Sequence, residues 1–110
     1  MSDEWGKDPS IRFMRRVFQS METTHKELLD LAGISPFDAR LRHWREAARN
    51  LFEQGWTLAA SRGFGLGEEQ ASVLYAHCFA KTLRAHGFEI PNERLPRDEK
   101  LSKLIQEVPS

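Results

Sequence analysis

The stretch LDLAGISPFD, residues 29–38, ends one helix and begins the next, and it sets the organisation of the chain. Gly33 can adopt the left-handed conformation that closes a helix, and Ile34 can then fold back onto Leu29 in the last turn, as in a Schellman motif. The same pair of a glycine and a large apolar residue recurs at Gly63-Phe64, opposite Ala59, and at Gly87-Phe88, opposite Leu83. These stops predict three long helices followed by a C-terminal remainder.

The first predicted helix runs from Pro9 to Ala32. Asp8 is a favourable N-cap, and proline is well tolerated at the first helical position. The apolar face, with Phe13, Val17 and Leu31 at its side, is broad enough to predict two neighbouring helices, as in a bundle. Its positions repeat at intervals of three and four residues, as one helical face requires: Ile11, Met14, Phe18, Met21, His25, Leu28 and Ala32.

The second predicted helix runs from Pro36 to Arg62, with Ser35 as its N-cap and Asp38 placed to complete a capping box. The connection after Gly33 is then about two residues long, so the first two helices are expected to form an antiparallel hairpin. A glycine inside a helix costs about 1 kcal/mol relative to alanine, so Gly55 predicts either close approach of a neighbouring helix or a kink. The inner face is predicted to carry Phe37, Leu41, Trp44, Ala48, Leu51, Gly55 and Leu58.

The third predicted helix, from Glu68 to His86, is apolar around most of its circumference. Such a helix is buried on most sides, so it is expected either to be the central helix of the fold or to meet another subunit. The residues of its apolar sector are Ala71, Leu74, Tyr75, Cys78, Phe79, Thr82, Leu83 and Ala85.

The C-terminal remainder is expected to be an extended connector bracketed by Pro91 and Pro96, followed by a short helix over residues 98–107. Helices this short are marginal alone, so this one must dock on the bundle or on a partner. The chain is therefore expected to be all-α, an antiparallel bundle of three long helices plus a short C-terminal helix. We expect a flexible arm over residues 1–8, the bundle over residues 9–89, and the connector and terminal helix over residues 90–110.

Composition restricts the classes of function. The chain has 110 residues, 40% of them hydrophobic, which indicates one globular domain rather than a disordered chain. Sixteen basic and sixteen acidic residues cancel, which argues against nucleic acid and anionic membranes as partners. Residues 1–10 lack the apolar core of a signal peptide, and the chain lacks an apolar run of membrane length. Together with the single cysteine, this predicts a cytoplasmic protein.

Candidate chemistry is sparse. Glu22 and His25 have the spacing of a metal-binding pair in di-iron bundles, but helical geometry points the matching pair, His43 and Glu46, outward. His25 lies on an apolar face, where a core histidine is the more common case. Cys78 lies in an apolar sector, where a thiol behaves as a small hydrophobic group. We therefore expect no metal, no cofactor and no enzymatic activity.

These observations predict a small cytoplasmic interaction or regulatory module, homodimeric through the third helix and the C-terminal tail, with a second copy or another protein as its partner. Trp56, at the edge of the second helix's inner face, is expected to be partly exposed. The alternative is a metal- or small-ligand-binding bundle around Glu22, His25 and the aromatic residues near Gly55. The predicted partner-binding residues are Trp56, Leu74, Tyr75, Phe79, Leu101, Leu104 and Ile105.

Overall fold

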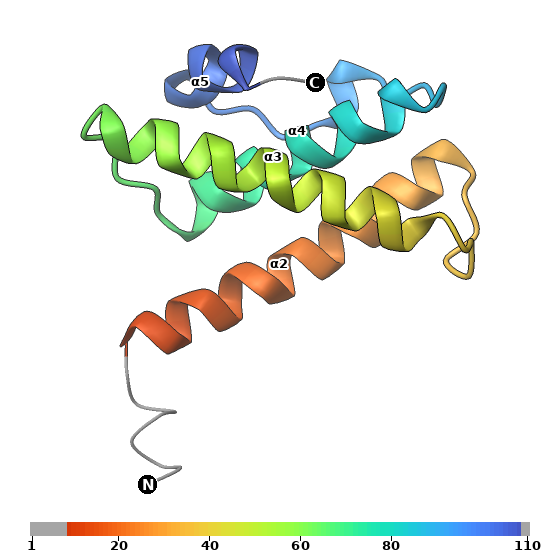
Figure 1. Cartoon of the computed structure of the whole chain (residues 1–110), viewed down its shortest axis with the longest axis horizontal. Helices are drawn as coiled ribbons and strands as arrows, with labels where there is room; N and C mark the ends of the chain where they lie inside the picture. Colours follow the sequence, from red (N-terminus) through yellow and green to blue (C-terminus); the bar gives the residue numbers. More distant parts are fainter. Residues whose placement is uncertain (1–8, 109–110) are drawn as a thin grey trace, which may run out of the picture.

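The computed structural model describes residues 9–108, with their side chains from Arg12 onward. It contains three long helices, α2 (Pro9–Ala32), α3 (Leu41–Ser61) and α4 (Glu68–Ala85), and a short helix α5 (Ser102–Glu107) near the C-terminus (Figure 1). Two 3₁₀ turns, η1 (Asn92–Arg94) and η2 (Glu99–Leu101), lie between α4 and α5. The predicted all-α bundle is therefore confirmed. The predicted arm over residues 1–8 lies outside the described residues.

The glycine stops close the three long helices as the sequence predicts. Gly33, Gly63 and Gly87 all have positive φ angles, of 70°, 70° and 91°. Each following apolar residue donates its backbone N–H to the carbonyl of the residue five positions earlier: Ile34 to Leu29 at 2.9 Å, Phe64 to Ala59 at 2.8 Å and Phe88 to Leu83 at 3.1 Å. These are the bonds that define the Schellman motif.

The predicted start of the second helix is wrong. Helix α3 begins at Leu41, five residues after Pro36, because Ser35 and Asp38 stabilise turns instead of a helix. The hydroxyl of Ser35 accepts the backbone N–H of Phe37 at 3.1 Å, and the carboxylate of Asp38 accepts that of Arg40 at 2.9 Å. Such local bonds compete with helix formation.

The placement of Phe37 on the inner face of the second helix is wrong for the same reason. The side chain of Phe37 stands on the connection between α2 and α3 and is 93% exposed.

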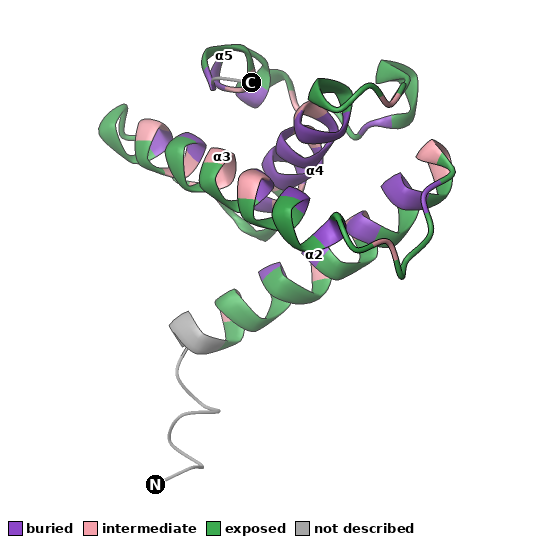
Figure 2. Ribbon diagram, turned by 45° about the vertical axis from the view of Figure 1, so that its right-hand side comes forward, coloured by how far each residue is buried: buried purple, intermediate pink, exposed green. Residues whose placement is uncertain are grey.

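Helix α4 is the centre of the fold (Figure 2). Helices α2 and α3 both pack along it, and α5 packs against α3 and α4 (Figure 1). One core cluster joins α2, α3 and α4 around Trp44, Tyr75 and Phe79, and a second joins α3, α4 and α5 around Leu74 and Leu101. The apolar residues that suggested a dimer contact through this helix are therefore covered within the chain, by α2, α3 and the C-terminal segment.

The C-terminal segment is held to the bundle by both apolar and polar contacts. The ammonium group of Lys81 donates to the backbone carbonyls of Ile105, at 2.5 Å, and Val108, at 2.6 Å, at the end of α5. A methyl group added at Gly55 would lie 3.1 Å from both terminal carbons of Leu74 and 3.2 Å from Cγ2 of Val108. This confirms the predicted close approach at Gly55.

Among the described residues, the helices lack the combination of length and apolar character that crossing a membrane requires.

Candidate functional site

Helices α2 and α3 diverge toward the N-terminus of α2, and the space between them is an open groove with a volume of about 540 Å³. We call it the α2–α3 groove. Its α2 wall is formed by Met14, Val17, Phe18 and Met21. Its α3 wall is formed by Arg49, Phe52, Glu53, Trp56 and Thr57.

The α2 wall carries two large apolar side chains that remain in contact with solvent. Met14 is 44% exposed and Phe18 is 47% exposed. The sequence places both on the helix face that also buries Met21, so their exposure differs from the expectation. Helix α2 has 24 residues and α4 has 18, so α2 is about 9 Å longer and α4 cannot cover it along its full length. The N-terminal half of α2 therefore projects beyond α4 (Figures 1 and 2).

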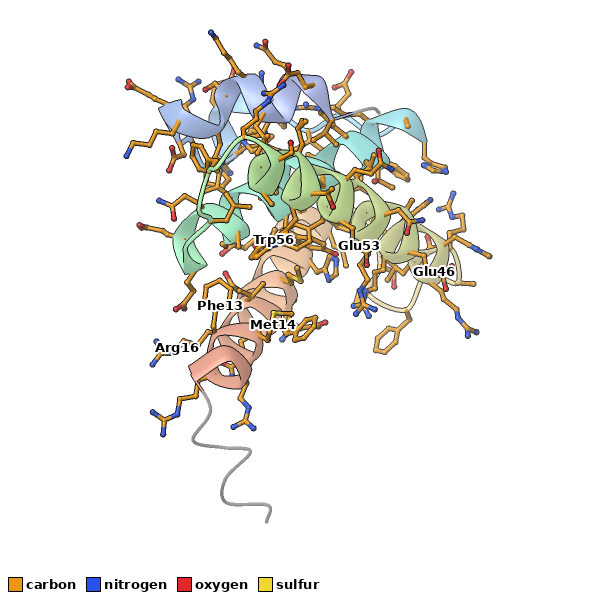
Figure 3. The ribbon with its side chains drawn as sticks, turned by 60° about the vertical axis from the view of Figure 1, so that its left-hand side comes forward. Phe13, Met14, Arg16, Glu46, Glu53 and Trp56 are labelled. Atoms are coloured by element: carbon orange, nitrogen blue, oxygen red, sulfur yellow. The ribbon has the colours of Figure 1, made fainter. Side chains whose placement is uncertain are left out.

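The aromatic side chains of the α3 wall are in contact with the core. Trp56 is partly buried, as expected, and lies between α3 and α2 beside Phe13 (Figure 3). Its ring centroid is 6.2 Å from that of Phe13 and 5.7 Å from that of Phe52. Phe52 in turn contacts Tyr75 of α4, edge to face, at 5.7 Å. Because the wall is fixed through Tyr75 to the core, it offers a preformed surface for a ligand.

Charged residues line the rim of the groove. Arg49 and Glu53 stand one turn apart on α3, and both are exposed. Toward the middle of α2, Arg45 lies 4.0 Å from the carboxylate of Glu22, and both side chains are largely exposed. Exposed pairs of this kind contribute less than about 1 kcal/mol, so they leave the groove open to rearrangement at its rim.

His25 lies one turn beyond Met21, where α2 closes onto α4. Its ring is 4% exposed and packs edge to face on Phe79, with centroids 4.4 Å apart. Nε2 shares a hydrogen bond with the hydroxyl of Tyr75, whereas Nδ1 is buried without a hydrogen-bond partner among the described residues. Burial, and to a smaller extent the charges of Arg45 and Arg49, lower the pKa of His25 from 6.5 to about 4.

The sequence candidates for a metal site point in different directions. His25 faces the core and is bonded to Tyr75, whereas Glu22 is exposed and pairs with Arg45. His43 and Glu46 are exposed on α3. Within the described part of the chain, no group of three or more His, Cys, Asp or Glu side chains is placed to hold a metal ion.

Cys78, the other side chain considered for chemistry, is buried in the core cluster that α5 covers, and burial raises the pKa of its thiol to about 12. A thiol with such a pKa stays protonated near neutral pH, and the thiolate is the form that attacks electrophiles.

The structure separates the predicted partner-binding residues. Trp56 lines the groove, and Ile105 is partly buried on α5. The remaining members of the set are buried within the chain and contact α2, α3 or α4: Leu74, Tyr75, Phe79, Leu101 and Leu104. Met14 and Phe18 were missed as candidates, because the predicted second helix was long enough to cover the whole of the first.

Comparison of the chain with protein-family models, with curated proteins and with solved structures found no match.

Proposed function

We propose that this chain is a small helical protein-interaction module that binds an amphipathic helix in the α2–α3 groove. The observation that carries the proposal is the pair of half-exposed side chains, Met14 and Phe18, facing the aromatic wall around Trp56. Contiguous exposed apolar surface on a small protein is characteristic of a contact site. An amphipathic helix laid into an apolar groove is one of the recurring modes of peptide recognition.

The shape and charge of the groove favour a helix over a small molecule. The groove is open along one side and is bounded by two helices, so a third helix in it would complete a bundle-like contact. Arg49 and Glu53 at the rim can pair with opposite charges flanking the apolar face of the incoming helix. Trp56 supplies the kind of partly buried aromatic anchor that dominates binding energy at interfaces.

A homodimer through α4 and the C-terminal tail is less well supported than binding in the groove. It would require Leu101 and Leu104 to leave the core, and Lys81 to give up its bonds to α5. Binding in the groove requires no such rearrangement. The proposal includes a cytoplasmic location, since a free thiol such as that of Cys78 is common in reducing compartments. It also includes a non-enzymatic role.

The proposal is tested by selecting helices from a phage-displayed library of amphipathic helical peptides on the immobilised full chain. We expect selected helices to bind the Phe18→Glu variant at least about tenfold more weakly, because a carboxylate in the groove would have to be desolvated. Phe37→Glu is the matched control, because Phe37 is exposed and lies outside the groove. Helices that bind both variants equally well would overturn the proposal.

A further inference from the structure

We infer that the occupant of the α2–α3 groove is helix α2 of a second copy of this chain, packed antiparallel about a dyad between Phe18 and Gln19. This inference rests on the proposed function of the groove. It is carried by the order of side chains along the exposed face of α2.

The charged residues of that face are complementary to themselves in one orientation. Met14 and Phe18 form its apolar strip, and Arg15 and Glu22 lie on the same surface beside them. Arg15 and Glu22 are seven residues apart, which is two helical turns or about 10.5 Å. The midpoint between them falls between Phe18 and Gln19. An antiparallel partner centred there places Arg15 of each copy opposite Glu22 of the other.

The parallel alternative is disfavoured by the same residues. In a parallel pair in register, Arg15 would face Arg15 and Glu22 would face Glu22, and like charges across an interface oppose association. The ion pair of Glu22 with Arg45 in the same chain does not prevent the antiparallel contact. That pair is long, at 4.0 Å, and exposed, so Glu22 can also accept Arg15 of the second copy.

The position of α2 makes this contact accessible. Its N-terminal half projects from the bundle, so a second copy can approach it without disturbing α4 or α5 (Figures 1 and 2). A two-fold interface uses the same patch on both subunits. Helix α2 meets this condition because it both lines the groove of its own chain and can fill the groove of the second copy. Phe18, next to the dyad, would then lie beside Phe18 and Gln19 of the second copy, and Met14 would lie opposite Thr23.

Sedimentation equilibrium on the full chain tests the inference through charge reversal. We expect the wild-type chain to form dimers. Arg15→Glu and Glu22→Arg should each raise the dimer dissociation constant about tenfold or more, because each change converts two attractive pairs into two repulsive ones. An equimolar mixture of the two variants should form a heterodimer about as tight as the wild-type dimer, since every pair is then attractive again.

Two further variants complete the experiment. The double variant R15E/E22R should restore the homodimer, because the exchanged charges again face each other. Arg42→Glu is the matched control and should leave the dissociation constant unchanged, since Arg42 is exposed on α3 outside the groove. At a concentration where every chain is monomeric, urea unfolding should give each variant about the stability of the wild type, because these charges are exposed in the folded chain.

Failure of this inference is distinguishable from failure of the proposed function. A wild-type chain that stays monomeric at every concentration overturns the second copy as the occupant, and so does a mixture that does not form the heterodimer. If phage-selected helices still require Phe18 in those cases, the groove remains a site for another helix. If the selected helices do not require Phe18, the groove proposal itself fails.

Discussion

Gly55 and Trp56 are adjacent on α3, yet they face two different edges of that helix, about 100° apart. Gly55 faces the edge covered by α4 and α5, where Leu74 and Val108 approach so closely that even a methyl group would crowd them. Trp56 faces the α2–α3 groove. One edge of α3 is therefore closed by the chain's own C-terminal segment, and the other edge is left open.

The difference follows from which segments are long enough to cover each edge. At the closed edge, Lys81 caps the end of α5 and Leu101 is fully buried between the helices. At the open edge, α2 extends beyond its neighbours and exposes Met14 and Phe18. Substitutions at the closed edge should therefore reduce the stability of the single chain, whereas substitutions at the open edge should reduce association.

The largest expected effect tests this contrast directly. Leu101→Ala should lower the free energy of unfolding by about 2–5 kcal/mol, because it leaves a cavity in the core beneath α5. Phe18→Ala removes a larger side chain but should cost less than about 1 kcal/mol, since that side chain is half-exposed. Urea unfolding at a concentration where the chain is monomeric measures both values. Equal losses would remove the distinction between the two edges.

The second prediction concerns His25, which marks the point where α2 passes from the open groove to the closed core. The pKa of His25 is about 4 in the folded chain, where the ring is buried, and 6.5 when the ring is in water. The unfolded chain therefore binds the proton more readily. The contribution of His25 to the free energy of unfolding is therefore fully present above pH 6.5. It is lost as the pH falls toward 4, by up to about 3 kcal/mol. Unfolding in urea across this pH range measures the loss.

The source of this pH dependence can be checked with two histidine variants, one at the buried His25 and one at the exposed His43. Tyr75 contacts its ring from α4, and Arg45 and Arg49 act on it from α3. His25→Gln should reduce the dependence of unfolding free energy on pH between 6.5 and 4, whatever its effect at pH 7, and His77, whose pKa burial also lowers, accounts for part of what remains. His43→Gln should leave that dependence unchanged, because His43 is exposed. Parallel curves for the two variants would exclude His25 as the source.

Much of the fold could be predicted from local signals. The Schellman stops at Gly33, Gly63 and Gly87 depend on residues close in sequence, and the structure confirms each of them. The start of α3 could not be placed, because Ser35 and Asp38 can stabilise either a helix or a turn. A local sequence pattern does not decide between those two outcomes.

The candidate site was harder to predict, because burial depends on how far neighbouring helices extend. The apolar circumference of α4 indicated either a central position or contact with another subunit, and it did not indicate that Leu101 and Leu104 would complete its cover. Met14 and Phe18 follow the same period as the buried Met21, so periodicity alone cannot separate the exposed end of the face from the covered one.

The smallest of the expected effects concerns the close packing at Gly55. Gly55→Ala gains about 1 kcal/mol of helix propensity, but the new methyl group would lie 3.1 Å from the terminal carbons of the fully buried Leu74. Because overpacking costs about 1–3 kcal/mol, we expect a net loss of about 1 kcal/mol in urea unfolding. Val108→Ala should reduce that loss by making room, whereas Gln54→Ala, at an exposed position, should change stability little. A net gain from Gly55→Ala would mean that Leu74 and Val108 can retreat, and the edge of α3 that faces α5 would then be less tightly closed than its contacts indicate.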